Sequence, residues 1–306
     1  MADDGVVRPV FLAREKWSMT MAEVSQQDRS RTGRDCIVFA CSGVRYAAEA
    51  VDAARQVKAV MPGIDIVGFA DAEGCKVYDG SGLFTRSFVI ENPARSYIDK
   101  ARIDLPDTYD RALFLDSDAY VIKPLDSVFE LLERFDMVVA HEPTRFTTDA
   151  AFRTLLDWGA PRSFPECNTG VIGFRNNAQV RAFFQSWREK HRELHDKTDP
   201  PVKVDQPSFR LALWESDLRF YILPPEFNFR HTLPGFIGGY YNVMVLHGRT
   251  KFQEHYSRKL GAYGDLPRVH VPFFWVVTGP RRLWRRWRRK HGMNKQWLKR
   301  TFGLSH

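Results

Sequence analysis

The first half of the chain alternates short apolar runs with segments of helical periodicity. The apolar runs suit strands buried on both faces of a sheet, and they occur at residues 36–41, 64–70, 87–90 and 111–115. Helical periodicity is found at residues 46–60, which Pro62-Gly63 ends, and at residues 95–104. Strands that alternate with helices predict an α/β protein with a mixed, mainly parallel sheet flanked by helices.

The second half is less regular but continues the same kinds of element. Apolar runs at residues 137–140, 169–174 and 219–223 predict further strands, and periodic segments at 125–135, 178–195 and 206–214 predict further helices. The chain has no internal repeat and no low-complexity linker before residue 265. We therefore expect a loosely ordered segment (1–34), one compact domain (35–265) and a C-terminal appendage (266–306).

Two carboxylates follow the predicted strand at 111–115. Ligands of open α/β sheets bind beyond the carboxyl ends of the strands, which is where Asp116 and Asp118 lie. If the chain stays extended, both side chains point the same way and can share one hard cation, Mg²⁺ or Mn²⁺. Such a cation would neutralise a departing diphosphate. The alternative interpretation is an ordinary Asp-rich turn.

The surrounding sequence resembles a known family. The stretch YDRALFLDSDAYVIKPLDSVFELL resembles the DxD segment of GT-A-fold glycosyltransferases, most closely family eight, which includes glycogenin-like enzymes and bacterial lipopolysaccharide galactosyl- and glucosyltransferases. Further matches follow the family's order: DCIVFACSGVRYAAEAV, SYIDKARI, CNTGVIGFRN, VDQPSFRLAL, PPEFNFR and VLHGRTK. The resemblance covers roughly residues 35–252. It implies a GT-A (Rossmann-like) fold and transfer of a hexose from a nucleotide-diphosphate sugar, with a UDP-sugar as the favoured donor.

The resemblance implies a metal site of three residues. Asp116 and Asp118 would bind the cation, and His247 would be the third protein ligand. An imidazole ligand favours Mn²⁺ over Mg²⁺. The alternative for His247 is a core histidine that follows the apolar run at 243–246.

The resemblance also implies residues that contact the nucleotide. Ala40, Ser42 and Tyr46 belong to the segment that contacts the base, and Asp116 and Ser117 would lie by the ribose and the diphosphate. The expected phosphate contacts are Lys100 or Arg102, together with Lys251 at the β-phosphate. For these three side chains the alternative is solvated charge.

Three residues are implied on the sugar and acceptor side. They are Asn168, Asp205 and Gln206, of which Asp205 and Gln206 are the candidates for a catalytic role in a transfer that retains the anomeric configuration. Asp205 is also a suitable N-cap for the helix predicted at 206–214. The two roles are compatible.

The sequence departs from the family pattern in two places. Cys41-Ser42-Gly43 stands where the family usually has an Asp that reads uracil. His247 is followed directly by Gly248, and the family's terminal Pro-Trp is absent. The first departure bears on which nucleotide base is recognised, and the second bears on where Lys251 lies.

The net charge of +8 is concentrated at the C-terminal end. Residues 281–306 contain ten Lys/Arg and no Asp or Glu, so residues 1–280 carry 35 basic and 37 acidic side chains. The stretch RRLWRRWRRK (281–290) predicts a helix with Leu and Trp on one side and cations on the other, which suits an anionic membrane surface. We expect residues 281–300 to associate with such a surface; nucleic-acid binding and a merely solvated tail are the alternatives.

Cysteines and hydropathy bear on localisation. The four cysteines show no CxxC spacing, and we expect reduced thiols in a cytosolic protein. No apolar run approaches the ~20 residues of a membrane span, and the first residues lack the pattern of a signal peptide. We therefore expect a cytoplasmic protein at the inner face of a membrane, with a saccharide or lipid-linked acceptor.

Two other functions fit parts of the sequence. One is a sugar-nucleotide nucleotidyltransferase, but the glycine-rich Gly-x-Gly-x-Arg start of that class is not found near Ser42-Gly43. The other is a non-catalytic nucleotide-sugar-binding protein, against which Asp116, Asp118 and His247 argue. The oligomeric state is not predicted.

Overall fold

The structure is a computed structural model, and it describes residues 34–142, 159–161, 163–199, 201–230, 235–237, 243–248 and 268–270. The predictions for residues 1–33, for Lys251 and for the cationic stretch at 281–300 lie outside the described residues. Within the described residues, no helix combines the length and the apolar character that crossing a membrane requires.

The first half folds into the predicted alternation of strands and helices. In chain order the elements are β1 (Asp35–Ala40), α2 (Val44–Val60), β2 (Asp65–Ala70), α3 (Ala72–Ser81), β3 (Arg86–Val89), the 3₁₀ helix η2 (Tyr97–Arg102) and β4 (Arg111–Leu115). The short strand β5 (Ala119–Val121) and helix α4 (Asp126–Leu131) follow. All four strands predicted in this half are present.

The second half adds three strands to the main sheet and several short elements. The longer elements are β6 (Met137–His141), β7 (Cys167–Arg175), α6 (Ala178–Lys197), α7 (Gln206–Glu215) and β8 (Phe220–Leu223). The short ones are η5 (Pro225–Asn228), β9 (Phe229–Arg230), β10 (Gly235–Ile237), β11 (Val245–His247) and β12 (Arg268–His270).

Seven strands form one sheet in the order β3-β2-β1-β4-β7-β6-β8. Neighbours β3/β2, β2/β1, β1/β4 and β6/β8 are parallel, whereas β7 is antiparallel to both β4 and β6. Only β7 therefore runs against the direction of the other six. The predicted α/β class with a mixed, mainly parallel sheet is confirmed.

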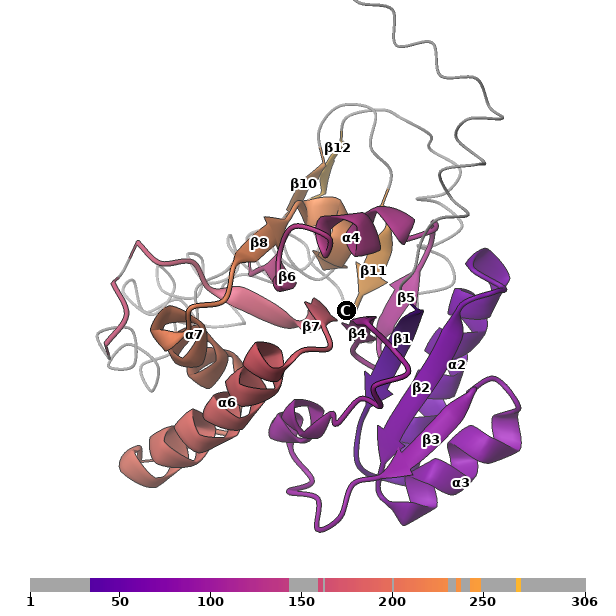
Figure 1. The fold of residues 1–306 in the computed structure, drawn as a ribbon, viewed down its shortest axis with the longest axis horizontal. Coiled ribbons are helices and arrows are strands. Elements are labelled where there is room, and N and C mark those ends of the chain that lie inside the picture. The colour runs from indigo at the N-terminus through magenta and orange to yellow at the C-terminus, as the bar shows by residue number, and fades with distance from the viewer. Residues whose placement is uncertain are drawn as a thin grey trace, which may run out of the picture. The chain divides into compact units, whose positions relative to one another are not determined.

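Helices cover both faces of this sheet (Figure 1). Ile37, Phe39 and Leu113 point to the face packed against α2, α3 and α4. Their neighbours Val38 and Phe114 point to the opposite face, where η2, α6 and α7 pack. Because successive side chains of a strand alternate between faces, an uninterrupted apolar run is what a sheet buried on both sides requires.

Two local elements differ from the sequence prediction. Helix α3 was not predicted, since Gly74 and Gly80 weaken a helical pattern. It is stabilised by Asp71, whose Oδ1 accepts a hydrogen bond from the Gly74 N–H at 2.9 Å. The segment expected to be helical at 95–104 is a shorter 3₁₀ helix at Tyr97–Arg102, and it begins with a capping box between Ser96 and Asp99.

A second, three-stranded sheet has the order β5-β11-β9. In its register His247 of β11 lies opposite Ala119 of β5 and opposite Arg230 of β9. β5 begins directly after Asp118. The small sheet therefore brings the distant His247 beside the residues that follow β4.

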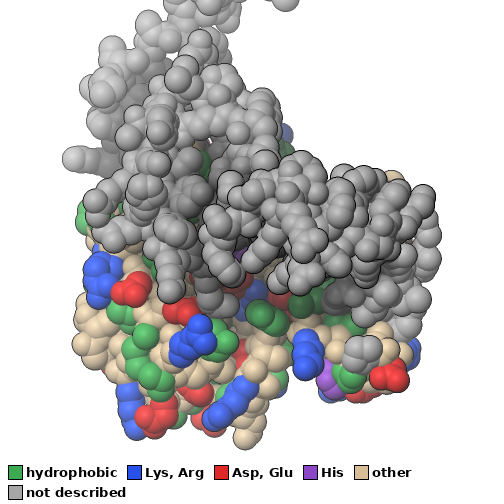
Figure 2. Space-filling model, turned by 180° about the vertical axis from the view of Figure 1, so that it is seen from behind, with side chains coloured by type: hydrophobic (Ala, Val, Ile, Leu, Met, Phe, Trp, Pro, Cys, Tyr) green, Lys and Arg blue, Asp and Glu red, His purple; other side chains and the backbone are tan. Residues whose placement is uncertain are grey.

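The four cysteines of the described domain are free thiols, as predicted, and three of them are buried. On the face seen in Figure 2, Lys and Arg side chains are interspersed with Asp and Glu side chains over the described surface. This mixture agrees with the near balance of charge in residues 1–280.

Candidate active site

Asp116 and Asp118 occupy a tight turn between β4 and β5. The Asp116 N–H donates to the Gly170 carbonyl at 2.9 Å, and the Asp116 carbonyl accepts from the Ala119 N–H at 2.9 Å. These backbone bonds fix the turn at the carboxyl end of β4, against the neighbouring strand β7. The position is the one that the strand-end rule predicts.

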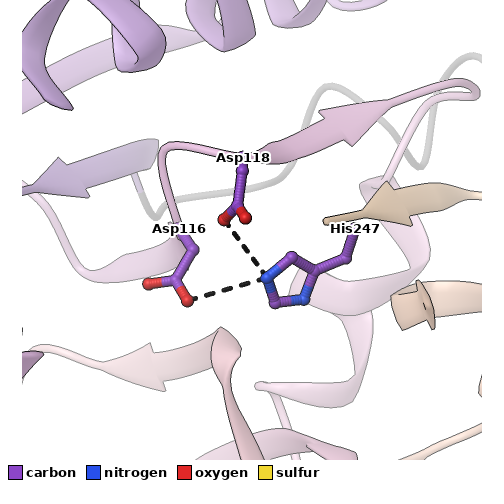
Figure 3. Close-up of side chains that lie close together, drawn as sticks. All are labelled: Asp116, Asp118 and His247. Carbon is purple, nitrogen blue, oxygen red and sulfur yellow. Dashed lines mark ion pairs between the residues drawn. The ribbon is translucent and has the colours of Figure 1, made fainter. Parts of the chain in front are cut away.

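His247 faces both carboxylates (Figure 3). Its Nε2 lies 3.3 Å from Asp118 Oδ1 and 3.7 Å from Asp116 Oδ2. One ligand atom from each of the three residues lies within 4.8 Å of the other two. Two carboxylates and one imidazole form a donor set that suits Mn²⁺.

A hydrogen bond holds the imidazole in an orientation suited to metal binding. His247 Nδ1 lies 2.7 Å from Asn228 Oδ1, an acceptor, so Nδ1 donates to it and Nε2 is the nitrogen that faces the carboxylates. Oriented histidines of this kind are typical of metal sites. Asn228, the last residue of η5, was not identified from the sequence.

Gly170 forms the floor of the site. A Cβ at this position would collide with the His247 ring and would lie 2.9 Å from both Asn168 Oδ1 and Asp116 Oδ2. The three side chains can converge there because β7 carries no side chain at Gly170. The need for glycine at position 170 was not evident from the sequence.

Lys100 connects the carboxylates of Asp116 and Asp205. Its Nζ lies 2.8 Å from Asp116 Oδ1 and 3.5 Å from Asp205 Oδ2, and it donates to the Thr169 carbonyl at 3.3 Å. Burial alone would lower the pKa of Lys100, but Asp116 and Asp205 outweigh it and raise this pKa above its usual value. Lys100 is therefore a fixed positive charge in the site.

Asp205 lies at the N-cap position of α7, but its side chain makes no capping hydrogen bond. Its Oδ2 instead accepts from the Thr169 hydroxyl at 2.8 Å, while its carbonyl accepts from Trp187 Nε1 at 3.1 Å. The expectation that the Asp205 side chain caps the helix is wrong. The Thr169 and Lys100 contacts direct this carboxylate to the site.

Glu142 is a buried carboxylate that accepts several side-chain hydrogen bonds, and it was not identified from the sequence. Its Oε2 accepts hydrogen bonds from Asn168 Nδ2 at 2.8 Å, from Gln206 Nε2 at 3.1 Å and from Arg230 Nη1 at 3.0 Å. It thereby fixes two of the three residues expected on the acceptor side. Glu142 follows β6 directly, so the strand-end rule that selected Asp116 would have selected it as well.

These residues line one cavity of about 460 Å³. With one exception, every described residue that was proposed for the site from the sequence lines this cavity. These residues are Ala40, Ser42, Tyr46, Lys100, Asp116, Ser117, Asp118, Asn168, Asp205, Gln206 and His247. The exception is Arg102. Additional lining residues include Cys41, Tyr97 and Arg230.

Arg102 points away from this cavity. Its Nη1 donates to the carbonyls of Glu91 and Asn92 at 3.1 and 3.0 Å, and its side chain lines a different cavity. Of Lys100 and Arg102, the two alternatives for one phosphate contact, the structure thus brings only Lys100 to the carboxylates.

The end of β1 forms the other side of the cavity. Ser42 Oγ donates to Asp99 Oδ2 at 2.6 Å, so this serine is tied to η2. Cys41, at the position of the family's base-reading Asp, lies 2.9 Å from the Tyr78 hydroxyl, and burial raises the pKa of its thiol to about 12. Cys41 is therefore a neutral thiol at physiological pH.

Comparison with known proteins finds solved structures of similar fold. No protein-family model and no curated protein matches the chain. The galactosyltransferase LgtC, in complex with donor and acceptor sugar analogues, aligns with a TM-score of 0.51 and 16% identity, covering 79% of this chain and 98% of that one. An active-site mutant of LgtC aligns with a TM-score of 0.52 and 17% identity over the same shares.

The fold and the candidate site together indicate the structural class to which the chain belongs, the GT-A fold. The chain has the fold of the LgtC structures, which is the GT-A fold predicted from the sequence, and an Asp-Asp-His group lies at the carboxyl end of its fourth strand. The particular proteins that it resembles in this fold are galactosyltransferases.

Proposed function

We propose that this protein is a metal-dependent glycosyltransferase. It transfers a hexose from a nucleotide-diphosphate sugar, with a UDP-sugar favoured, to a hydroxyl of a saccharide or lipid-linked acceptor. The observation that carries the proposal is the convergence of Asp116, Asp118 and His247 in a cavity that also contains Lys100 and Asp205. The GT-A fold supports the same reading.

Asp116, Asp118 and His247 would hold the divalent cation, with Mn²⁺ favoured and Mg²⁺ the alternative. The oriented His247 imidazole and the side-chain-free floor at Gly170 support this assignment. A cation bound there supplies positive charge to a departing diphosphate.

Lys100 supplies a second positive charge that does not depend on the metal. Because its ammonium group is buried and held by Asp116 and Asp205, it is positioned before any substrate arrives. Charge fixed in advance costs no reorganisation when negative charge develops on the leaving group. Lys251 would add to this charge at the β-phosphate.

The acceptor side is assigned to Asn168, Asp205 and Gln206. Glu142 holds the amides of Asn168 and Gln206, and Thr169 holds the carboxylate of Asp205. Side chains locked in this way can position a sugar hydroxyl against the donor. Transfer with retention is proposed, with Asp205 and Gln206 as the candidates for the catalytic role.

We also propose that residues 281–300 attach the protein to the cytoplasmic face of an anionic membrane. The ten Lys/Arg of the last 26 residues and the interleaved Trp and Leu support this proposal. The full chain is expected to co-sediment with vesicles that contain phosphatidylserine. A chain truncated after Gly279 is expected to remain in the supernatant. Equal co-sedimentation of both chains would contradict it.

A hydrolysis assay tests the proposed reaction. The full chain is incubated with UDP-, GDP- and dTDP-hexoses, with Mn²⁺ or with a chelator, and release of nucleoside diphosphate is measured. We expect metal-dependent hydrolysis, with the UDP-sugars turned over most rapidly. Binding without turnover would instead indicate a non-catalytic protein, and pyrophosphate release from a nucleoside triphosphate and a sugar phosphate would indicate a nucleotidyltransferase.

A further inference from the structure

A second and larger cavity lies beside the first. It has a volume of about 1140 Å³ and is bounded by the segment from β3 through η2 on one side and by α6 on the other. Arg95, Ser96 and Tyr97 line both cavities. A molecule that fills the second cavity can therefore extend to the cavity that holds the metal-site residues.

Positive charge dominates the wall of this cavity. Among the described residues, the lining includes six Arg or Lys side chains and two carboxylates, Glu91 and Asp104. The cations are Arg95, Arg102, Arg181, Arg188, Arg192 and Lys203. The cavity thus carries a local excess of positive charge, although residues 1–280 are close to neutral.

Helix α6 presents three of these cations on one side. Arg181, Arg188 and Arg192 are spaced seven and four residues apart, which places them along one face of a helix. Phe184 lines the same cavity from this helix, so the wall combines apolar surface with guanidinium groups. Apolar and aromatic surface beside hydrogen-bond donors is typical of sites that bind organic ligands.

Several of the cations lack a carboxylate partner. Within the part of the chain that the structure describes, Arg95, Arg192 and Lys203 form no ion pair. Arg188 donates to the Ala101 carbonyl at 2.6 Å. Burial and the neighbouring charge of Arg102 lower the pKa of Arg188. Like charges gathered at a partly buried surface repel one another, and a bound anion would relieve this repulsion.

Arg102 supports the same conclusion. Its Nη1 is held by backbone carbonyls, and its Nε is buried without a hydrogen-bond partner among the described residues, with Asp99 Oδ1 at 3.5 Å. The backbone contacts fix the guanidinium at the cavity wall. Arg102 therefore contributes a fixed positive charge at the wall, which favours a bound anion.

We propose that this cavity binds a phosphate group carried by the acceptor saccharide. The assignment of the ligand as acceptor rests on the proposed function, whereas the binding of a phosphorylated saccharide does not. The cavity adjoins the one that contains Asp205 and Gln206, so an acceptor anchored by its phosphate can extend a hydroxyl toward those residues.

Calorimetric titration of the full chain with trehalose 6-phosphate and with trehalose, in chelator and without nucleotide, tests the inference. The wild type is expected to bind the phosphorylated sugar about tenfold or more tightly than the neutral one, because paired guanidinium–phosphate bonds are strong. The double variant R188Q/R192Q is expected to lose this preference. K190Q/K197Q removes two charges from the same helix outside the cavity and is expected to keep it.

Two results would overturn the inference. One is a wild type that shows no preference for trehalose 6-phosphate, including a wild type that binds neither sugar at millimolar concentration. The other is an R188Q/R192Q variant that keeps the preference, with native secondary structure verified by circular dichroism. Since no donor or metal is present, the result is independent of the hydrolysis assay, and either idea can fail while the other stands.

Discussion

At the residue scale, the site depends on supporting residues as much as on the side chains that line the cavity. Asn228 fixes the imidazole of His247, and Glu142 holds Asn168 and Gln206. Such supporting contacts hold reactive groups in one geometry before substrate binds. Gly170 is the clearest case, since its contribution is the absence of a side chain.

Replacement of Gly170 by alanine tests this contribution. The added Cβ would collide with the His247 ring, so Gly170→Ala is expected to weaken Mn²⁺ binding about tenfold or more, the scale typical of changes that misplace a ligand. Gly80→Ala is the matched control, because a Cβ there meets nothing within 4 Å. Calorimetric titration with Mn²⁺ gives the two affinities, and an unchanged affinity in Gly170→Ala would contradict the assigned role.

The sequence predicted the residues whose local pattern carries chemistry. Asp116 and Asp118 follow an apolar strand, and this is sufficient to place them at the sheet's ligand-binding edge. His247 required the family resemblance, because it lies in a three-residue strand whose pairing with β5 is not encoded in any local periodicity. Thr169 and Gly170 were missed because their roles arise only from contacts with residues distant in the chain.

At the element scale, the strands were easier to predict than the connections. Apolar runs predict strands irrespective of their partners, and all seven strands of the main sheet correspond to such runs, although the edge strands β3 and β8 are short and partly exposed. Helix α3 was missed because its stability comes from the Asp71 cap and from packing of Cys75 and Tyr78 rather than from propensity. The 3₁₀ helix η2 begins with a capping box, and it carries Lys100, which lines the cavity.

A buried ion pair joins the first and fourth strands. Arg111 of β4 makes two contacts with Asp35 of β1, at 2.6 and 3.0 Å, and its Nη1 donates to the Phe129 carbonyl. Asp35→Ala would leave this buried guanidinium with only Glu133, at 3.3 Å, and the Phe129 carbonyl, and it is expected to lower the free energy of unfolding by about 2 kcal/mol.

An exposed pair provides the control for that variant. Asp52 and Arg55 lie on the surface of α2 at 2.6 Å, and Asp52→Ala is expected to change the free energy of unfolding by about 0.5 kcal/mol or less. Urea denaturation of both variants gives the comparison. Equal losses would show that the Arg111–Asp35 pair does not anchor β1 to β4.

At the scale of the whole molecule, the charged side chains fall into three regions, and we propose a different ligand for each. The metal-site cavity combines three carboxylates with Lys100, the second cavity gathers six cations, and the surplus of the whole chain belongs to residues 281–300. The net charge of +8 therefore describes none of the sites by itself. Each region has its own proposed partner, namely a nucleotide-sugar donor, a phosphorylated acceptor and an anionic membrane.

The central claim is that Asp116 and Asp118 bind the cation on which sugar transfer depends. The most direct measurement is the rate of Mn²⁺-dependent UDP-hexose hydrolysis by Asp116→Ala and Asp118→Ala, with Asp107→Ala, an exposed aspartate outside the cavity, as the control. Loss of either metal ligand is expected to lower turnover by more than about 100-fold with the fold intact, while the control keeps the wild-type rate. Wild-type turnover in both folded metal-site variants would contradict the account.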